Sequence, residues 1–170
     1  MTYSKRKYHK ALETLVYLAE NENRHYWVLK AIYLADKEHL HKFGRQLFDD
    51  SYIAMKDGPV PSLAYDIVKC ARGDGRYTFT DLEPKNAINV PDRFHIYPNR
   101  PFQSELLSQS EIECLDSALK IVKPLTFDQL KSLSHDEAYK SAQQDEEIST
   151  EKIIESLDNG KDILEYMQSK

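Results

Sequence analysis

Apolar residues recur every three or four positions along most of this chain, which is the spacing of amphipathic helices. Helices are predicted over residues 4–21, 24–42, 59–72, 108–123, 126–133 and 150–157, with shorter turns after residues 134 and 160. Gly44 marks the end of the second helix, and Ser108 with Glu111 forms a capping box before the fourth. Pro59 and Pro61 suit the first turn of the third helix, where a missing N–H costs nothing. About six helices are therefore expected.

A small β section is predicted in the middle of the chain. The segments Arg76–Thr80, Ala87–Val90 and Arg93–Tyr97 alternate or carry β-branched and aromatic residues. We expect them to form an antiparallel hairpin or a three-stranded sheet near residues 76–97. The segment Gln46–Met55 is expected to connect helices, with a brief extended stretch at most. The predicted fold class is mainly α (α+β), in one compact domain spanning residues 1–170, because no linker or repeat divides the chain.

Two ionisable residues fall on the apolar face of the second predicted helix. With Trp27 at zero and a step of 100° per residue, this face spans about 100° to 240°, and Asp36 and His39 lie inside it. Lys30 and Lys37 fall on the opposite side. Because a charged group among apolar side chains needs a partner, another segment is expected to contact the helix at Asp36 and His39.

Charge is distributed unevenly. Residues 1–80 contain 13 Lys and Arg against 10 Asp and Glu, whereas residues 81–170 contain 10 against 18. The net charge of −5 argues against nucleic acid as a partner, because phosphate contacts supply most of the affinity of such complexes. The acidic second half suggests a basic partner protein. A solvated helix face is the simpler alternative for the same acidic residues.

Composition indicates a globular protein of the cytoplasm. Hydrophobic residues make up 41% of the chain, and no apolar run approaches the roughly 18 residues that cross a membrane. The N-terminus lacks the apolar core of a signal peptide. The two cysteines, Cys70 and Cys114, lie far apart in helical contexts and are expected to be buried free thiols, as in a reducing compartment. No membrane association is expected.

Common enzyme motifs are missing from the sequence. It contains no HExxH, CxxC or GxSxG pattern and no glycine-rich phosphate loop. His39 and His41 are two positions apart, so they do not share the helix face that a pair of zinc ligands needs. We therefore expect no enzymatic activity, no metal and no cofactor; a metal bridging His39 and His135 is the alternative.

A longer motif joins the second predicted helix to the segment that follows it. It consists of Tyr33, Leu34, Ala35, Asp36, His39, Gly44, Arg45, Tyr52, Ala54, Gly58, Pro59, Val60 and Pro61. Further along, His135 lies in a Leu-Ser-His stretch, and Tyr139 stands where a Trp is common. In these residues the chain resembles the Panacea domain, the SocA-like antitoxin family, which is often phage-associated. The resemblance extends over about residues 10–140.

The resemblance implies a function in protein binding. Members of the family act as antitoxins that neutralise a toxin encoded beside them through direct contact. A role as an adaptor that hands the toxin to an ATP-dependent protease is also implied. Two alternatives stay open: a phage- or mobile-element-encoded adaptor acting on a host factor, and a DNA-binding regulator of its own operon. The identity of the toxin does not follow from the resemblance.

For the motif itself, we hypothesise a buried Asp36–His39 pair beneath the turn at Gly58, with Asp36 accepting N–H groups of that turn. Arg45 would bridge the same carboxylate or the carbonyls that end the helix. On this view the motif fixes segment 45–62. A toxin-contacting cleft and a catalytic site are the alternatives. Candidate binding surfaces are the acidic region Asp145–Glu165 and the aromatic residues Tyr77, Phe79, Phe94 and Tyr97.

Overall fold

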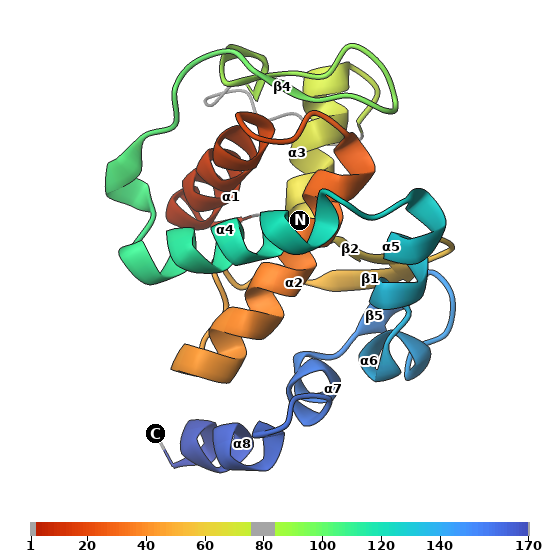
Figure 1. Ribbon diagram of the computed structural model, residues 1–170. Helices are drawn as coiled ribbons and strands as arrows, with labels where there is room; N and C mark the ends of the chain where they lie inside the picture. Colours follow the sequence, from red (N-terminus) through yellow and green to blue (C-terminus); the bar gives the residue numbers. More distant parts are fainter. Residues whose placement is uncertain (1–2, 76–83, 170) are drawn as a thin grey trace.

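The long helix α2 (His25–Phe43) runs through the middle of the fold (Figure 1). The computed structural model describes residues 3–75 and 84–169. Helix α4 (Gln109–Val122) crosses α2 and makes the most extensive contact with it, while α1 (Lys5–Ala19) packs against α3 (Ser62–Arg72). The core is formed by apolar side chains of all four helices, for example Leu15, Ile32, Ile67 and Leu115. The mainly α fold class with small antiparallel sheets is confirmed.

Local capping signals explain most helix ends. The Ser4 hydroxyl accepts the N–H of Lys7 at the start of α1, and Ser108 forms a complete capping box with Glu111 at the start of α4. Such caps stabilise a helix by about 1 kcal/mol each. Gly44, with φ of 74°, ends α2 in the left-handed conformation that glycine adopts without strain. These boundaries agree with the sequence patterns.

The three-stranded sheet lies in a different part of the chain from the predicted one. Strands β1 (Tyr52–Met55) and β2 (Gly58–Pro61) form an antiparallel hairpin, and β5 (Glu147–Ile148) adds to the other edge of β1. The pairing of Tyr52 with Ile148 joins the C-terminal part of the chain to the hairpin. The brief extended stretch expected within 46–55 is present as β1, but its pairing into a sheet was not predicted, because short strands without clear alternation give little sequence signal.

Pro59 and Pro61 belong to β2, not to the first turn of a helix as predicted. Proline cannot donate to a strand ladder, but β2 is an edge strand that pairs with β1 alone, where proline is tolerated. Helix α3 begins immediately afterwards, at Ser62. The prolines therefore precede the helix instead of opening it.

A second, two-stranded sheet occupies part of the predicted β section. Strand β3 (Ile88–Asn89) pairs antiparallel with β4 (Tyr97–Pro98), between the short 3-10 helices η1 (Pro84–Asn86) and η2 (Ser104–Leu106). The predicted strand at 76–80, with Tyr77 and Phe79, lies outside the described residues. The predicted strands at 87–90 and 93–97 are thus confirmed only in part, as a pair of two-residue strands.

The C-terminal third contributes four helices that complete the fold. They are α5 (Phe127–Ser134), α6 (Glu137–Lys140), α7 (Thr150–Glu155) and α8 (Gly160–Gln168), and they bring the α-helices of the described residues to eight. Helices α7 and α8 lie beside the C-terminal half of α2, at the bottom of Figure 1. Asn159 fixes this arrangement by exchanging hydrogen bonds with the ring and the carbonyl of His41. Across residues 3–75 and 84–169, no helix combines the length and the apolarity that a membrane span requires.

Replacing Gly58 by Ala is expected to destabilise the protein by about 3 kcal/mol, because it combines backbone strain with a steric clash. Gly58 has φ of 126°, and an added Cβ would lie 2.6 Å from Ser134 Oγ and 2.9 Å from Lys30 Cε. Gly73→Ala is the matched control, since Gly73 also has a positive φ but has open space around it. This control is expected to cost about 1 kcal/mol. Equal losses in urea unfolding would contradict the close packing at Gly58.

Candidate functional site

The Asp36 carboxylate connects helix α2 to the segment that follows it. Asp36 is 1% exposed; its Oδ1 accepts the N–H of Leu47 at 2.8 Å, and its Oδ2 accepts a short hydrogen bond from the Tyr52 hydroxyl. Burial raises the pKa of Asp36 to about 7, against the lowering effect of these two hydrogen bonds. The prediction that another segment meets the helix at Asp36 is confirmed. Its partners are the loop after α2 and strand β1, not the turn at Gly58.

His39 makes a separate pair of hydrogen bonds one turn further along. Its Nδ1 lies 2.8 Å from the Arg45 carbonyl, and its Nε2 lies 2.9 Å from Ser110 Oγ. Because a carbonyl only accepts, Nδ1 carries the proton and Nε2 accepts from the serine hydroxyl. Burial lowers the pKa of His39, which favours this neutral tautomer. The predicted Asp36–His39 pair is therefore wrong: each side chain is buried, as expected, but each has its own partners.

Arg45 binds a carboxylate on α4 and not that of Asp36. Its guanidinium donates to Glu111 Oε2 at 2.8 Å, and the Lys10 ammonium of α1 donates to the same oxygen at 2.6 Å. Burial by itself would raise the pKa of Glu111, but the hydrogen bonds from Lys10, Ser108 and Arg45 hold it at about 2. Glu111 thereby joins α1, α4 and the loop after α2. The expected bridge from Arg45 to Asp36 is not made.

Lys30 lies in the interior, although the helical wheel placed it on the polar side. It is 1% exposed, and its ammonium donates to the Pro59 carbonyl at 2.8 Å and lies 4.7 Å from the centre of the Tyr26 ring. Burial lowers the pKa of Lys30 to about 7. The side chain passes directly over Gly58, where a larger residue would collide with it. The Gly-Pro-Val-Pro segment thus lies against α2 through Lys30 instead of through Asp36.

The C-terminal part of the motif contacts both helix α2 and the same hairpin. The Tyr33 hydroxyl and the Lys37 ammonium both donate to Asp136, the residue that caps α6. The hydroxyl of Tyr139 donates to the Met55 carbonyl at 2.6 Å, and its ring packs 4.1 Å from that of His135. Tyr139 therefore attaches α6 to β1.

Asp50 is a buried carboxylate that the sequence interpretation did not single out. It accepts the N–H groups of Leu63 and Ala64, so it caps helix α3 from a distant position in the chain. Pro61, the residue before the helix, makes no side-chain cap of its own. A helix start without a local capping residue was the signal that could have prompted a search for this partner.

Two features of the described residues bear on other kinds of site. Within residues 3–75 and 84–169, no three His, Cys, Asp or Glu side chains gather closely enough to hold a metal ion. Both cysteines are free: Cys114 is buried, as predicted, whereas Cys70 is half-buried. The motif residues described above are joined by internal hydrogen bonds and ion pairs.

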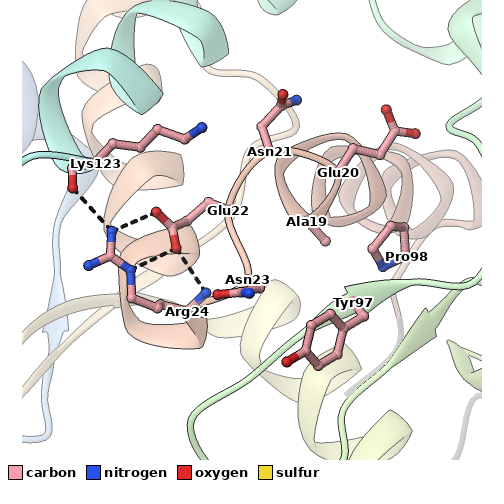
Figure 2. Close-up of a pocket in the computed structure, with 9 residues that line it drawn as sticks. All are labelled: Ala19, Glu20, Asn21, Glu22, Asn23, Arg24, Tyr97, Pro98 and Lys123. Atoms are coloured by element: carbon pink, nitrogen blue, oxygen red, sulfur yellow. Dashed lines mark hydrogen bonds and ion pairs between the residues drawn. The ribbon is translucent and has the colours of Figure 1, made fainter.

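An open pocket of about 610 Å³ lies between the loop after α1, strand β4 and the end of α4 (Figure 2). Arg24 dominates one wall, but its guanidinium already binds both oxygens of Glu22 and the carbonyl of Lys123. The ring of Trp27 also packs 4.0 Å from this guanidinium. Because Arg24 and Glu22 already neutralise each other, this pocket offers little to an ionic ligand.

We call the contacts of Asp36, His39, Glu111, Lys30 and Asp136 the buried polar network. They join a β-hairpin to the central helix of a helical domain. Residues 28–140 match the family model described as antitoxin SocA-like, Panacea domain. The match covers more than half of the chain, so the chain belongs to this family. No curated protein and no solved structure shows significant similarity to it.

Replacing Asp36 by Ala is expected to reduce the free energy of unfolding by about 3 kcal/mol, because the Leu47 N–H and the Tyr52 hydroxyl lose their buried acceptor. The melting temperature and urea midpoint would both report the loss. Asp158→Ala, at an exposed position, is the matched control and is expected to change neither. An unchanged melting temperature in the Asp36→Ala variant would show that the network does not hold the loop.

The stability contributed by Asp36 is expected to depend on pH. Its pKa is about 7 in the folded protein and about 3.9 when unfolded, so the folded state retains a proton that the unfolded state releases. Between pH 4.5 and 7, the stability of the wild type relative to Asp36→Asn is therefore expected to fall as pH rises, with a limiting slope of about 1.4 kcal/mol per unit. Parallel pH profiles of the two proteins would contradict the raised pKa.

Proposed function

We propose that this protein is an antitoxin that neutralises a cognate protein toxin by direct binding. The observation that carries the proposal is membership of the SocA-like antitoxin family over residues 28–140. The family model spans most of the motif helix α2, the β-hairpin and α4 to α6, so it covers the elements joined by the buried polar network except helix α1.

The contacts of the motif support binding instead of catalysis. A catalytic acid or base must reach a substrate, whereas Asp36 and His39 are 1% and 0% exposed and hydrogen-bond to their own chain. Each holds a neighbouring segment in place: Asp36 holds the loop and β1, and His39 holds the loop and α4. The proposed role of the motif is therefore to fix the shape of a binding surface formed by other residues.

Charge supports a protein partner. Exposed acidic side chains are frequent in the last part of the chain, including Glu147 on β5, Glu151 and Glu155 on α7, and Asp162 on α8. They would attract a basic toxin, and opposite charges mainly speed encounter and discriminate against wrong partners. The same residues would repel nucleic acid. We place this activity in the cytoplasm, where free thiols such as Cys114 persist.

Co-expression with the adjacent gene tests the proposal. Induction of that gene alone is expected to stop growth, and simultaneous expression of this protein is expected to restore growth and yield a complex that co-purifies. Asp36→Ala, which loosens the fold, is expected to protect less well than Asp158→Ala.

Toxicity that this protein leaves unchanged would overturn the proposal. Protection that disappears in cells lacking an ATP-dependent protease would add the adaptor role. A promoter-binding assay with the purified protein would separate toxin neutralisation from regulation of its own operon.

A further inference from the structure

A second cavity, of about 460 Å³, lies where the start of α2, the turn between β1 and β2, helix α3 and the loop before β4 come together. Five aromatic side chains and five basic ones dominate its lining, and we call it the basic aromatic pocket. The aromatic residues are Tyr26, Trp27, Tyr65, Phe94 and Phe127, and the basic residues are Arg24, Lys30, Lys56, Arg72 and Arg93. None of the motif's carboxylates lies in this lining.

The charge of the basic aromatic pocket is opposite to that of the whole chain. Its described lining contains a single acidic residue, Asp57, although the chain carries a net charge of −5. Arg24 and Arg72 are paired with nearby carboxylates, but Lys56 and Arg93 are exposed and have no ion-pair partner within residues 3–75 and 84–169. An anionic group bound here would find two cations that are not already neutralised.

The interior of the pocket contains polar groups with spare hydrogen-bonding capacity. The Lys30 ammonium uses one N–H for the Pro59 carbonyl, and no second acceptor is found for it among the described residues. The Nδ1 of His25 donates to the Arg93 carbonyl at 3.4 Å, whereas its buried Nε2 has no partner in that part of the chain. Buried polar atoms are rarely left unpaired without a reason, so an occupant that supplies polar atoms is expected.

The walls would favour an apolar or aromatic side chain. Phe94 is 71% exposed and Phe127 is 39% exposed, which is unusual for phenylalanine. The Phe127 ring lies 4.7 Å from that of Tyr26, and Tyr65 stacks on His25. An aromatic group inserted between these rings would be sheltered from water and would in turn cover part of Phe94.

We propose that the basic aromatic pocket binds a segment of the partner protein in which an aromatic residue is flanked by carboxylates. This proposal rests on the proposed antitoxin function and identifies one part of the toxin-binding surface. The aromatic side chain would enter between the rings, and the carboxylates would face Lys56 and Arg93 at the rim. A nucleic acid is the poorer fit, because a long polyanion would meet the acidic remainder of the molecule.

Charge reversal at the rim tests the pocket in cells. Lys56→Glu combined with Arg93→Glu changes two exposed side chains, so the melting temperature is expected to stay at the wild-type value. The matched control, Lys120→Glu with Lys161→Glu, makes the same change in net charge at exposed positions away from the pocket. The rim variant is expected to weaken toxin binding at least tenfold and to lose protection, whereas the control variant protects like the wild type. Full protection by a folded rim variant would overturn the pocket proposal and leave the antitoxin function standing.

A binding experiment that needs no toxin keeps the two proposals separable. The peptide acetyl-Asp-Phe-Asp-Glu-amide, its neutral counterpart acetyl-Asn-Phe-Asn-Gln-amide and a short oligouridylate would each be titrated into isotope-labelled protein and followed by amide chemical shifts. The acidic peptide is expected to shift amides around Tyr26, Lys56 and Phe94 and to bind more tightly than the neutral one. Shifts with the oligouridylate alone, or with none of the three probes, would overturn the proposal. Peptide binding by a protein that fails to protect cells would support the pocket while refuting the antitoxin function.

Discussion

One buried carboxylate, that of Asp36, joins helix α2 to the segment that follows it. It accepts hydrogen bonds from the loop after α2 and from the first strand of the hairpin, so a single buried group holds both segments against the helix. Burial of a carboxylate is unfavourable unless hydrogen bonds compensate for the lost water, and Leu47 and Tyr52 supply them. Once the hairpin is placed, Lys30 can reach the Pro59 carbonyl and Tyr139 can reach that of Met55.

Three further carboxylates join other segments of the fold in the same way. Glu111 gathers Lys10 and Arg45, and so joins the first helix to α4 and to the loop. Asp50 caps α3, and Asp136 receives both Tyr33 and Lys37 while it starts α6. Each carboxylate joins segments far apart in sequence. The arrangement explains how a mainly helical chain with short strands obtains a defined shape around one central helix.

Sequence patterns were reliable where the determining contacts are local. Caps such as Ser108 with Glu111, and the glycine after α2, set helix ends through neighbours three or four residues away. The helical wheel also predicted that Asp36 and His39 are buried. It failed for Lys30, because the polar face of a helix can be covered by a hairpin whose position depends on distant contacts. Strand β2 was not predicted for the same reason. A segment with two prolines can be a strand only at the edge of a sheet, and its edge position depends on distant contacts. The partners of Asp36 and Arg45 likewise depend on packing that periodicity does not encode.

Strand β5 gives the C-terminal segment a role that the limits of the family match do not suggest. Glu147 and Ile148 pair with β1, and the Ala54 N–H extends the ladder by donating to the Glu146 carbonyl at 2.9 Å. Residues 146–148 lie beyond the matched region, which ends at residue 140. A fragment trimmed to that region would present β1 with an open edge of unsatisfied N–H and C=O groups, which is a template for adding a foreign strand. The last thirty residues therefore cover this edge of β1 as well as extending the domain.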